Sequence, residues 1–273
     1  MIDIKTRCVR VNYANQFHID ILPGFPEEKY SRNNKLKVPD TEIKDWTDSN
    51  PKGYAEWFDD NCSKVNAILM EKRAMSSVEP LPESPPYQFV EPLRRAIQLI
   101  KRFRDIYYKD KESSGPRSIV LTTLAAAYYN GEDSEYEAIL NILNGISKAI
   151  INSNGKPIEI YNPTNLKEKL SEKWDDDPNL YSDFCKFVRY FNNQWIDLNR
   201  LESFEEKAIV LQELFGELVS KEVIREQTEY INKFRNNNNL AIDTTTGILT
   251  GLTLENKFNT NLKVVPKNTF YGK

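Results

Sequence analysis

Apolar and polar residues alternate in two short runs near the N-terminus, at residues 9–13 and 17–21. Successive side chains of a β-strand point to opposite faces, so this alternation predicts two strands that are each apolar on one face. The polar residues 14–16 separate the runs and favour an antiparallel hairpin. His18 and Asp20 then lie on the polar face of the second strand. The apolar positions of the two runs are Val9, Val11, Tyr13, Phe17, Ile19 and Ile21.

The apolar spacing changes to that of amphipathic helices later in the chain. Between residues 92 and 107, apolar residues recur at the i, i+3, i+4 and i+7 positions, and Pro92 suits the first turn of a helix. Ser203 and Glu206 form the pattern of a capping box at the start of a later helix. A short extended piece is expected at residues 156–165. Further helices are predicted at residues 53–73, 116–131, 134–152, from 166 onward, 179–200 and 203–235.

Polar and proline-rich stretches divide the chain. Residues 26–53 are polar and contain prolines, so we expect a long excursion without regular structure there. Residues 76–88 contain four prolines and are typical of a linker or domain boundary. We therefore predict an α+β protein with a partial sheet domain at 1–75, a mostly helical domain at 76–235 and a C-terminal tail or short hairpin at 236–273.

The composition narrows the function classes. The chain has 273 residues with 37 basic and 40 acidic side chains, so no overall positive field favours nucleic acid. His18 is the single histidine, which excludes a histidine-rich zinc site. The three cysteines are dispersed, which argues against a disulfide framework and favours a reducing compartment. No apolar run approaches the roughly 20 residues of a membrane-spanning helix, so we expect a cytoplasmic protein.

Asp20 is the first candidate for chemistry. A carboxylate on the polar face of a strand is a suitable ligand for a hard cation such as Mg²⁺, which binds one or two carboxylates together with substrate phosphates. A single aspartate on an exposed strand face is more often simply solvated, because short patterns have a large false-positive risk. The strand pattern alone leaves both interpretations open.

Two basic residues stand out on the helix predicted at 92–107. At about 100° per residue, Arg104 falls inside the apolar stripe and Lys101 falls at its edge. An unpaired buried charge is costly, so Arg104 needs a partner. One interpretation gives Arg104 a structural carboxylate and lets the Lys101 ammonium reach solvent along the helix surface. The other makes Lys101 a point charge for a phosphate.

The next predicted helix adds hydroxyl groups. Ser118 lies in its first turn, where free backbone N–H groups and the helix dipole favour anions. Ser118, Thr122 and Tyr129 fall near one line along the helix, which suits the close approach of a ligand. Tight helix packing, with the hydroxyls bonded to the preceding turn, is the structural alternative. Tyr128 or Tyr129 offers a ring for stacking on a base, although most of the 14 tyrosines are expected to be structural.

Six segments together resemble one family in their order and spacing. They are HIDILP, WTDSNPKGYAEWF, LRRAIQLIKRFRDIYY, PRSIVLTTLAAAYYNG, YNPTNLKEKLSEKWDDD and NTFYG. This order is similar to that of the bacterial cyclic GMP-AMP synthase-like nucleotidyltransferases, or CD-NTases, of the polymerase-β-like superfamily. The resemblance covers most of residues 7–200 and the last few residues. It implies a partial polymerase-β-like nucleotidyltransferase sheet, then a helical domain like that of oligoadenylate synthetases and poly(A) polymerases, with the active site in the cleft between them.

The resemblance also implies a reaction. Family members hold two Mg²⁺ (or Mn²⁺) ions on three carboxylates and join ATP and other nucleoside triphosphates into cyclic or linear oligonucleotides, releasing pyrophosphate. These products are second messengers in antiphage defence. By this resemblance, Asp20 corresponds to the third carboxylate. Lys101 and Ser118 correspond to positions that contact the donor triphosphate, and Arg104 and Tyr129 are further candidates for nucleotide binding.

One part of the family pattern does not occur before Asp20. The first two carboxylates of the family belong to an Asp-x-Asp strand that follows a Gly-Ser turn, and neither lies between Met1 and Asp20. Asp3 lacks the glycine turn and is not assigned to that role. The sequence thus presents one of three metal carboxylates, and catalysis by this polypeptide alone is not expected. Three explanations stay open: a chain read from an internal methionine, a split enzyme whose other half is a second chain, or a degenerate relative that only binds.

Two functions follow as hypotheses. The first is a nucleotidyltransferase, or the C-terminal part of one. The second is a non-catalytic nucleotide-binding or interaction module that uses Lys101, Arg104 and Ser118 without turnover. Nucleoside triphosphates are the expected partners in both, without membrane association or strong nucleic-acid binding. The family's first strands do not occur in this sequence. Without them we expect the hairpin to have an open edge, which favours pairing with another chain or aggregation.

Overall fold

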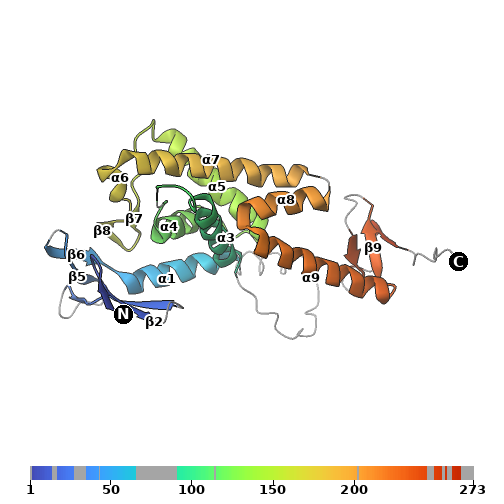
Figure 1. The fold of residues 1–273 in the computed structure, drawn as a ribbon, viewed down its shortest axis with the longest axis horizontal. Coiled ribbons are helices and arrows are strands. Elements are labelled where there is room, and N and C mark those ends of the chain that lie inside the picture. The colour runs from blue at the N-terminus through green and yellow to red at the C-terminus, as the bar shows by residue number, and fades with distance from the viewer. Residues whose placement is uncertain are drawn as a thin grey trace. The chain divides into compact units, whose positions relative to one another are not determined.

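The computed structural model describes residues 2–13, 17–27, 35–42, 44–65, 91–113, 115–201, 203–244, 249–253, 256 and 260–265. The chain divides into two compact units, Met1–Arg200 and Leu201–Lys273 (Figure 1). In its described part, the first unit combines small antiparallel sheets with long helices, and the second combines two helices with one small sheet. The predicted α+β class is confirmed.

The N-terminal sheet has three antiparallel strands in the order β1 (Ile2–Ile4), β2 (Val9–Tyr13) and β3 (Phe17–Ile21). The predicted alternation is confirmed, because the strands β2 and β3 occupy the two predicted runs. Their register places Arg10 opposite Asp20. Since paired residues share a face, the polar residues of both strands lie on one side of the sheet.

The other side of this sheet is apolar and open to solvent within the described part of the chain. Its ring pair, Tyr13 and Phe17, stacks with centroids 4.8 Å apart. The most exposed side chains are Ile4 at 81% and Ile2 at 69%. The residues that share this face by register are Ile2, Ile4, Val9, Val11, Tyr13, Phe17, Ile19 and Ile21. We call it the apolar face of β1–β3.

The prediction of an irregular excursion at residues 26–53 is wrong. This region forms a second antiparallel sheet from β4 (Phe25–Pro26), β5 (Leu36–Asp40) and β6 (Asp45–Ser49). The side chains of Val38 and Asp40 are buried in it. Proline and charged residues hide this strand pattern, because they are rare in strands and are typical of loops.

Helices make up most of the remaining described part of the first unit. Phe103 is 1% exposed, and its ring centroid lies 4.3 Å from that of Phe191 and 5.1 Å from that of Phe187. The stripe predicted for residues 92–107 is confirmed, because its apolar positions up to Phe103 are buried. The long helices are α1 (Pro51–Cys62), α3 (Pro92–Tyr107), α4 (Ser118–Tyr128), α5 (Glu135–Asn152) and α7 (Pro178–Arg200).

The helix predicted from residue 166 is absent. A two-stranded hairpin, β7 (Tyr161–Asn162) and β8 (Asn165–Lys169), is followed by the four-residue helix α6 (Lys173–Asp176). Asn162 sets the turn, because its Oδ1 accepts hydrogen bonds from both the N–H and the hydroxyl of Thr164. Good helix formers therefore occupy a strand that the turn and the neighbouring strand β6 hold in place.

The second unit begins with the predicted capping box at Ser203, which the structure confirms. The single helix predicted at 203–235 is instead two, α8 (Phe204–Phe215) and α9 (Glu217–Asn236), because Gly216 adopts a φ of 86° between them. The tail forms a three-stranded antiparallel sheet in the order β10 (Leu249–Gly251), β9 (Leu240–Asp243) and β11 (Leu262–Val264).

The compact units differ from the predicted domains. The predicted boundary at residues 75 and 76 lies outside the described residues. At the predicted boundary of 235 and 236 the helix α9 continues, and it packs against β9 and β10 of the same unit. None of the described helices is both long enough and apolar enough to cross a membrane.

Candidate functional site

Asp20 lies on the polar face of β3, as the alternation predicts. Its two carboxylate oxygens each accept a hydrogen bond of 2.8 Å from the guanidinium of Arg10 on β2. These hydrogen bonds lower the pKa of the Asp20 carboxyl, so the group stays ionised at neutral pH. The side chain remains 39% exposed. A cation that binds Asp20 must therefore share these oxygens with Arg10, because each carboxylate oxygen can accept more than one bond.

A second carboxylate lies on the same face but at a distance. Asp3 stands opposite Arg10 on β1, so Arg10 separates it from Asp20. The backbones of residues two strands apart in a sheet are about 10 Å from each other, and the Asp3 carboxylate accepts a hydrogen bond of 2.9 Å from the side-chain amide of Asn12. Among the described residues, no group of three or more His, Cys, Asp or Glu side chains is placed to hold a metal ion.

Arg104 and Ser118 are brought together where α3 and α4 meet. The Nη1 atom of Arg104 donates a hydrogen bond of 2.8 Å to the Ser118 hydroxyl and one of 3.3 Å to the carbonyl of Pro116. Its Nε and Nη2 atoms donate to the carboxylate of Asp105. Arg104 therefore has the carboxylate partner that the structural interpretation requires, Asp105. The same guanidinium also lies beside the hydroxyl of Ser118.

Lys101 lies one turn before Arg104 on α3. Burial, and then the charge of Arg104, lower the pKa of its ammonium. The ammonium makes no hydrogen bond or ion pair with any residue that the structure describes. A half-buried cation without a partner is costly, and an anion bound beside it relieves that cost.

Ser118 is the first residue of α4 and is exposed. The residue before it, Arg117, caps the helix without a side-chain hydrogen bond, so the first-turn N–H groups are free of a side-chain cap. Such groups, with the helix dipole, bind phosphate oxygens. We call Lys101, Arg104 and Ser118 the α3–α4 corner; it gathers two cations, a hydroxyl and a helix N-terminus.

Tyr129 must be removed from the nucleotide-binding candidates. Its side chain is 0% exposed, and its hydroxyl donates a hydrogen bond of 2.7 Å to the carbonyl of Glu132. Burial raises the pKa of this phenol above its usual value. A ring enclosed on all sides offers no face to a base, because α4 turns this residue toward its packing partners rather than toward solvent.

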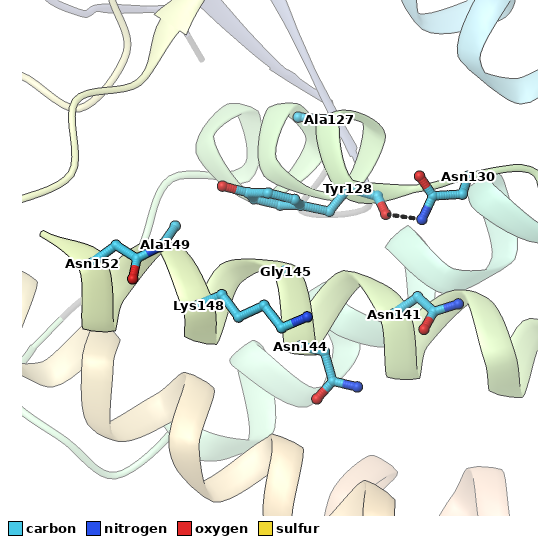
Figure 2. A pocket seen from close by; sticks show the side chains of 9 residues that line it. All are labelled: Ala127, Tyr128, Asn130, Asn141, Asn144, Gly145, Lys148, Ala149 and Asn152. Atoms are coloured by element: carbon cyan, nitrogen blue, oxygen red, sulfur yellow. Dashed lines mark hydrogen bonds between the residues drawn. The ribbon is translucent and has the colours of Figure 1, made fainter.

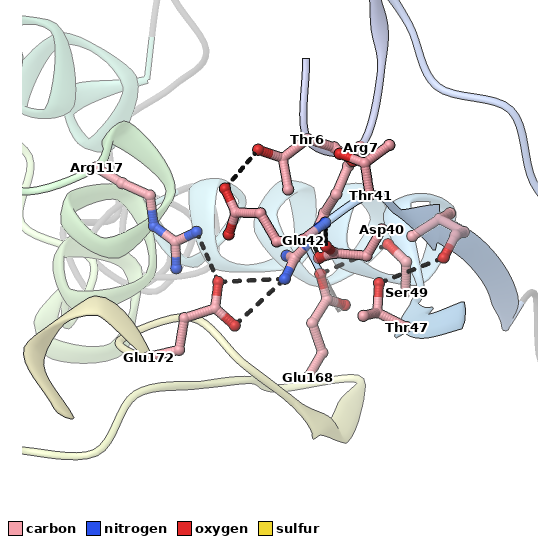
Figure 3. Close-up of polar contacts among 11 residues, drawn as sticks. Thr6, Arg7, Asp40, Thr41, Glu42, Thr47, Ser49, Arg117, Glu168 and Glu172 are labelled. Atoms are coloured by element: carbon pink, nitrogen blue, oxygen red, sulfur yellow. Dashed lines mark hydrogen bonds and ion pairs between the residues drawn. The ribbon is translucent and has the colours of Figure 1, made fainter. Parts of the chain in front are cut away.

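A charged network that the sequence pattern does not indicate lies beside the α3–α4 corner, next to Ser118 (Figure 3). Glu172 accepts hydrogen bonds from Arg117 at 3.0 Å and from Arg7 at 3.3 Å. Arg7 also donates a hydrogen bond of 2.6 Å to the buried carboxylate of Asp40, and Arg117 donates to the carbonyl of Leu170. The network therefore joins the β1–β2 connection, strand β5, the segment before α6 and the N-cap of α4.

The structure does not join Asp20 to the α3–α4 corner by contact. No hydrogen bond or ion pair of the described residues links them. The predicted site thus consists of two parts within the first unit: a strand carboxylate held by Arg10, and a corner with the chemistry of a phosphate site. A strand carboxylate and a phosphate-site corner on an α+β framework are the features that the resemblance to nucleotidyltransferases leads us to expect.

Comparisons with known proteins give the family. No family model matches. The chain is 35% identical over 270 residues to a c-di-GMP synthase of Roseivirga ehrenbergii, across 98% of this chain and 69% of that protein. It is 25% identical over 192 residues to the cyclic dinucleotide synthase CdnG of Bradyrhizobium diazoefficiens, across 63% of this chain and 45% of that protein. The chain belongs to the CD-NTase family of nucleotidyltransferases, which join nucleoside triphosphates into cyclic oligonucleotides.

Solved structures agree with this fold. The structure of B. diazoefficiens CdnG in complex with GTP is similar with a TM-score of 0.64 and 18% identity, over 84% of this chain and 69% of that one. The 3′-deoxy GTP bound form of Escherichia coli DncV is similar with a TM-score of 0.56 and 19% identity, over 81% of this chain and 52% of that one. The chain therefore spans about half the length of DncV.

Proposed function

We propose that this chain holds the donor triphosphate of a cyclic dinucleotide synthase at its α3–α4 corner, and that Asp20 supplies one carboxylate of the metal site. The observation that carries the proposal is the half-buried ammonium of Lys101, which has no partner among the described residues and lies one helical turn from the Arg104–Ser118 contact. The names of two relatives, a c-di-GMP synthase and a CD-NTase in complex with GTP, make GTP the first substrate to test. The product is proposed to be a second messenger in antiphage defence.

The corner residues have distinct roles in this proposal. Lys101 and Arg104 neutralise phosphate charge, including the charge that builds on the leaving pyrophosphate. The hydroxyl of Ser118 accepts from Arg104, so its own O–H is free to donate to a phosphate oxygen. The first-turn N–H groups of α4 add to the same binding surface.

The proposed metal is Mg²⁺ or Mn²⁺, and the described residues fit it only in part. One ionised carboxylate suits a single hard cation that also binds phosphates. It does not suit a pair of cations, which needs further carboxylates at short range. We therefore derive no reaction step through a metal from these residues.

A non-catalytic nucleotide-binding module is the second candidate. It is favoured by the bond between Asp20 and Arg10, which occupies both carboxylate oxygens. In such a module the α3–α4 corner binds a triphosphate, while Asp20 serves only to hold the hairpin together.

Binding and turnover of GTP separate the two candidates. We expect Lys101→Gln to weaken GTP binding about tenfold, the usual cost of losing one charge-assisted hydrogen bond. Lys156→Gln, an exposed lysine after α5, is the matched control and should bind like the wild type. Pyrophosphate release is measured in parallel with Mg²⁺ or Mn²⁺, in the wild type and in Asp20→Asn.

Each outcome decides between the candidates. Release that Asp20→Asn abolishes, with GTP binding kept, supports the synthase. GTP binding that needs Lys101, without release in either protein, supports the binding module. GTP binding of equal strength in the wild type and Lys101→Gln, or no binding at all, contradicts both.

A further inference from the structure

A cavity of about 430 Å³ opens between α4 and α5, and none of the three residues of the α3–α4 corner lines it. Figure 2 shows it from close by, with the C-terminal end of α4 on one side and α5 from Asn141 to its end at Asn152 on the other. Its volume lies within the range of small-molecule binding sites. Ser118 and Tyr128 are the two ends of the same helix, α4, which separates this cavity from the α3–α4 corner by about 15 Å.

Gly145 shapes one wall of the cavity. A Cβ atom at this position would lie 2.5 Å from the Cγ and Cδ1 atoms of Tyr128, so only glycine lets the tyrosine ring lie against the backbone of α5. Glycine inside a helix costs about 1 kcal/mol relative to alanine. The Tyr128 ring extends along α5 toward Ala149, and it carries its hydroxyl along the cavity (Figure 2). That hydroxyl has no partner among the residues that the structure describes.

The polar groups of the lining are mostly free donors. Lys148 forms no ion pair or hydrogen bond with any described residue. The Oδ1 atom of Asn144 accepts from Asn192 at 3.4 Å, which leaves the Nδ2 group of Asn144 to donate. Asn152, one turn beyond Lys148 on α5, also has no partner within the described part of the chain. None of the described residues that line the cavity carries a carboxylate.

One carboxylate borders the cavity at its Asn130–Asn141 end. Glu132 accepts a hydrogen bond of 2.8 Å from the Nδ2 atom of Asn141 and one of 3.1 Å from the N–H of Asn130, and both donors belong to the lining. These bonds hold the carboxylate at that end, and Lys148 is the charged residue among the described residues of the lining. One cation with several amide and hydroxyl donors is the donor set that recognises phosphate oxygens.

We propose that this cavity is a second anion site that binds the phosphate of a nucleotide-sized molecule. Lys148 supplies the charge, Asn144 and Asn152 supply amide donors, and Tyr128 supplies an O–H at one end. The site does not depend on the α3–α4 corner, because the two surfaces share no residue.

The test uses the full chain, with three probes in separate titrations: inorganic phosphate, GMP and c-di-GMP. Chemical shifts of backbone amides locate the binding, and equilibrium dialysis gives its strength. We expect at least one nucleotide to shift the amides of Gly145 and Lys148. We expect Lys148→Gln to weaken that binding about tenfold and Lys148→Arg to retain it. Lys156→Gln, which removes a lysine outside the lining, should match the wild type.

Two further variants keep the test decisive. Tyr128→Phe deletes only the hydroxyl and should weaken binding a few-fold, with the fold checked by circular dichroism. Lys101→Gln should leave the binding at Gly145 unchanged, so failure of the proposed corner and failure of this cavity are told apart. Equal binding in the wild type and Lys148→Gln, or shifts confined to the α3–α4 corner, would overturn the proposal. Binding of inorganic phosphate without either nucleotide would overturn its nucleotide-sized ligand.

Discussion

Lys101 combines partial burial with the nearby charge of Arg104, and both lower the pKa of its ammonium. It therefore loses its proton at a lower pH than an ordinary lysine. Phosphate binds the charged form, so the affinity for triphosphate should fall as the pH rises through this lowered pKa. We expect the decline in GTP affinity to begin at a lower pH than the ordinary lysine pKa of about 10.4 would give.

The control for this pH dependence is Lys101→Arg. Arginine keeps its charge throughout the alkaline range, so this variant should lose the decline while it still binds GTP. Dissociation constants measured at steps between about pH 7 and pH 10 give the comparison. A decline of the same shape in both proteins would show that another group is responsible.

Some residues of the site follow from the sequence and others do not. The face of Asp20 is predictable, because alternation in a strand fixes which side chains share a side. The contact between Arg104 and Ser118 is not, because it depends on the path of the connection between α3 and α4, where Gly115 adopts a φ of 68°. The burial of Tyr129 likewise depends on what packs against α4, which a single helix pattern does not reveal.

At the scale of elements, Glu172 ties α4 to the N-terminal strands through two arginines. Replacing it with glutamine removes the charge that both Arg7 and Arg117 face. Because these side chains are about one third exposed, the free energy of unfolding should fall by no more than about 1 kcal/mol per pair. The local effect should be larger: amide hydrogen exchange should speed up in the first turn of α4.

Glu159→Gln is the matched control for Glu172→Gln. Glu159 is 60% exposed and pairs with Lys169 on the β7–β8 hairpin, away from α4. Its replacement should leave exchange in the first turn of α4 unchanged. Equal exchange rates there in Glu172→Gln and Glu159→Gln would mean that the network does not hold the N-terminus of α4.

Some helices and strands can be predicted from the local sequence pattern, and others cannot. The helices at 92–107 and 134–152 follow from apolar periodicity and their start signals, because each packs one stripe into the core. The strand β8 cannot be predicted in this way, because its two lysines and its glutamate favour a helix. The turn at Asn162 and the neighbouring strand hold it in an extended conformation. The break between α8 and α9 is a single residue, Gly216, inside a continuous helical pattern. The spacing of apolar residues does not predict its positive φ.

At the scale of the molecule, the apolar face of β1–β3 stands out among the described residues, because several of its large apolar side chains are exposed to solvent. Exposed apolar side chains that gather on one sheet mark an interaction surface or an aggregation hazard. We expect the 273-residue polypeptide to self-associate as its concentration rises. Ile4→Thr and Ile19→Thr should reduce that association, because each removes apolar surface from this face.

Sedimentation velocity over a range of concentrations measures this effect. Ile151→Thr is the control, because Ile151 is 72% exposed but lies on α5, outside this face. Its association should equal that of the wild type. A polypeptide that stays monomeric at every concentration, or one whose association Ile151→Thr reduces as much as Ile4→Thr does, would contradict the prediction.

Helix α4 starts at Ser118 and ends at Tyr128, and each end borders a different surface of the first unit. The hydrogen bonds of an α-helix run along its axis, so the rod is stiff in that direction. The two surfaces therefore keep a fixed separation along one stiff rod. Each can be filled without moving the wall of the other, so two ligands bound at the two ends of α4 would neither help nor hinder each other.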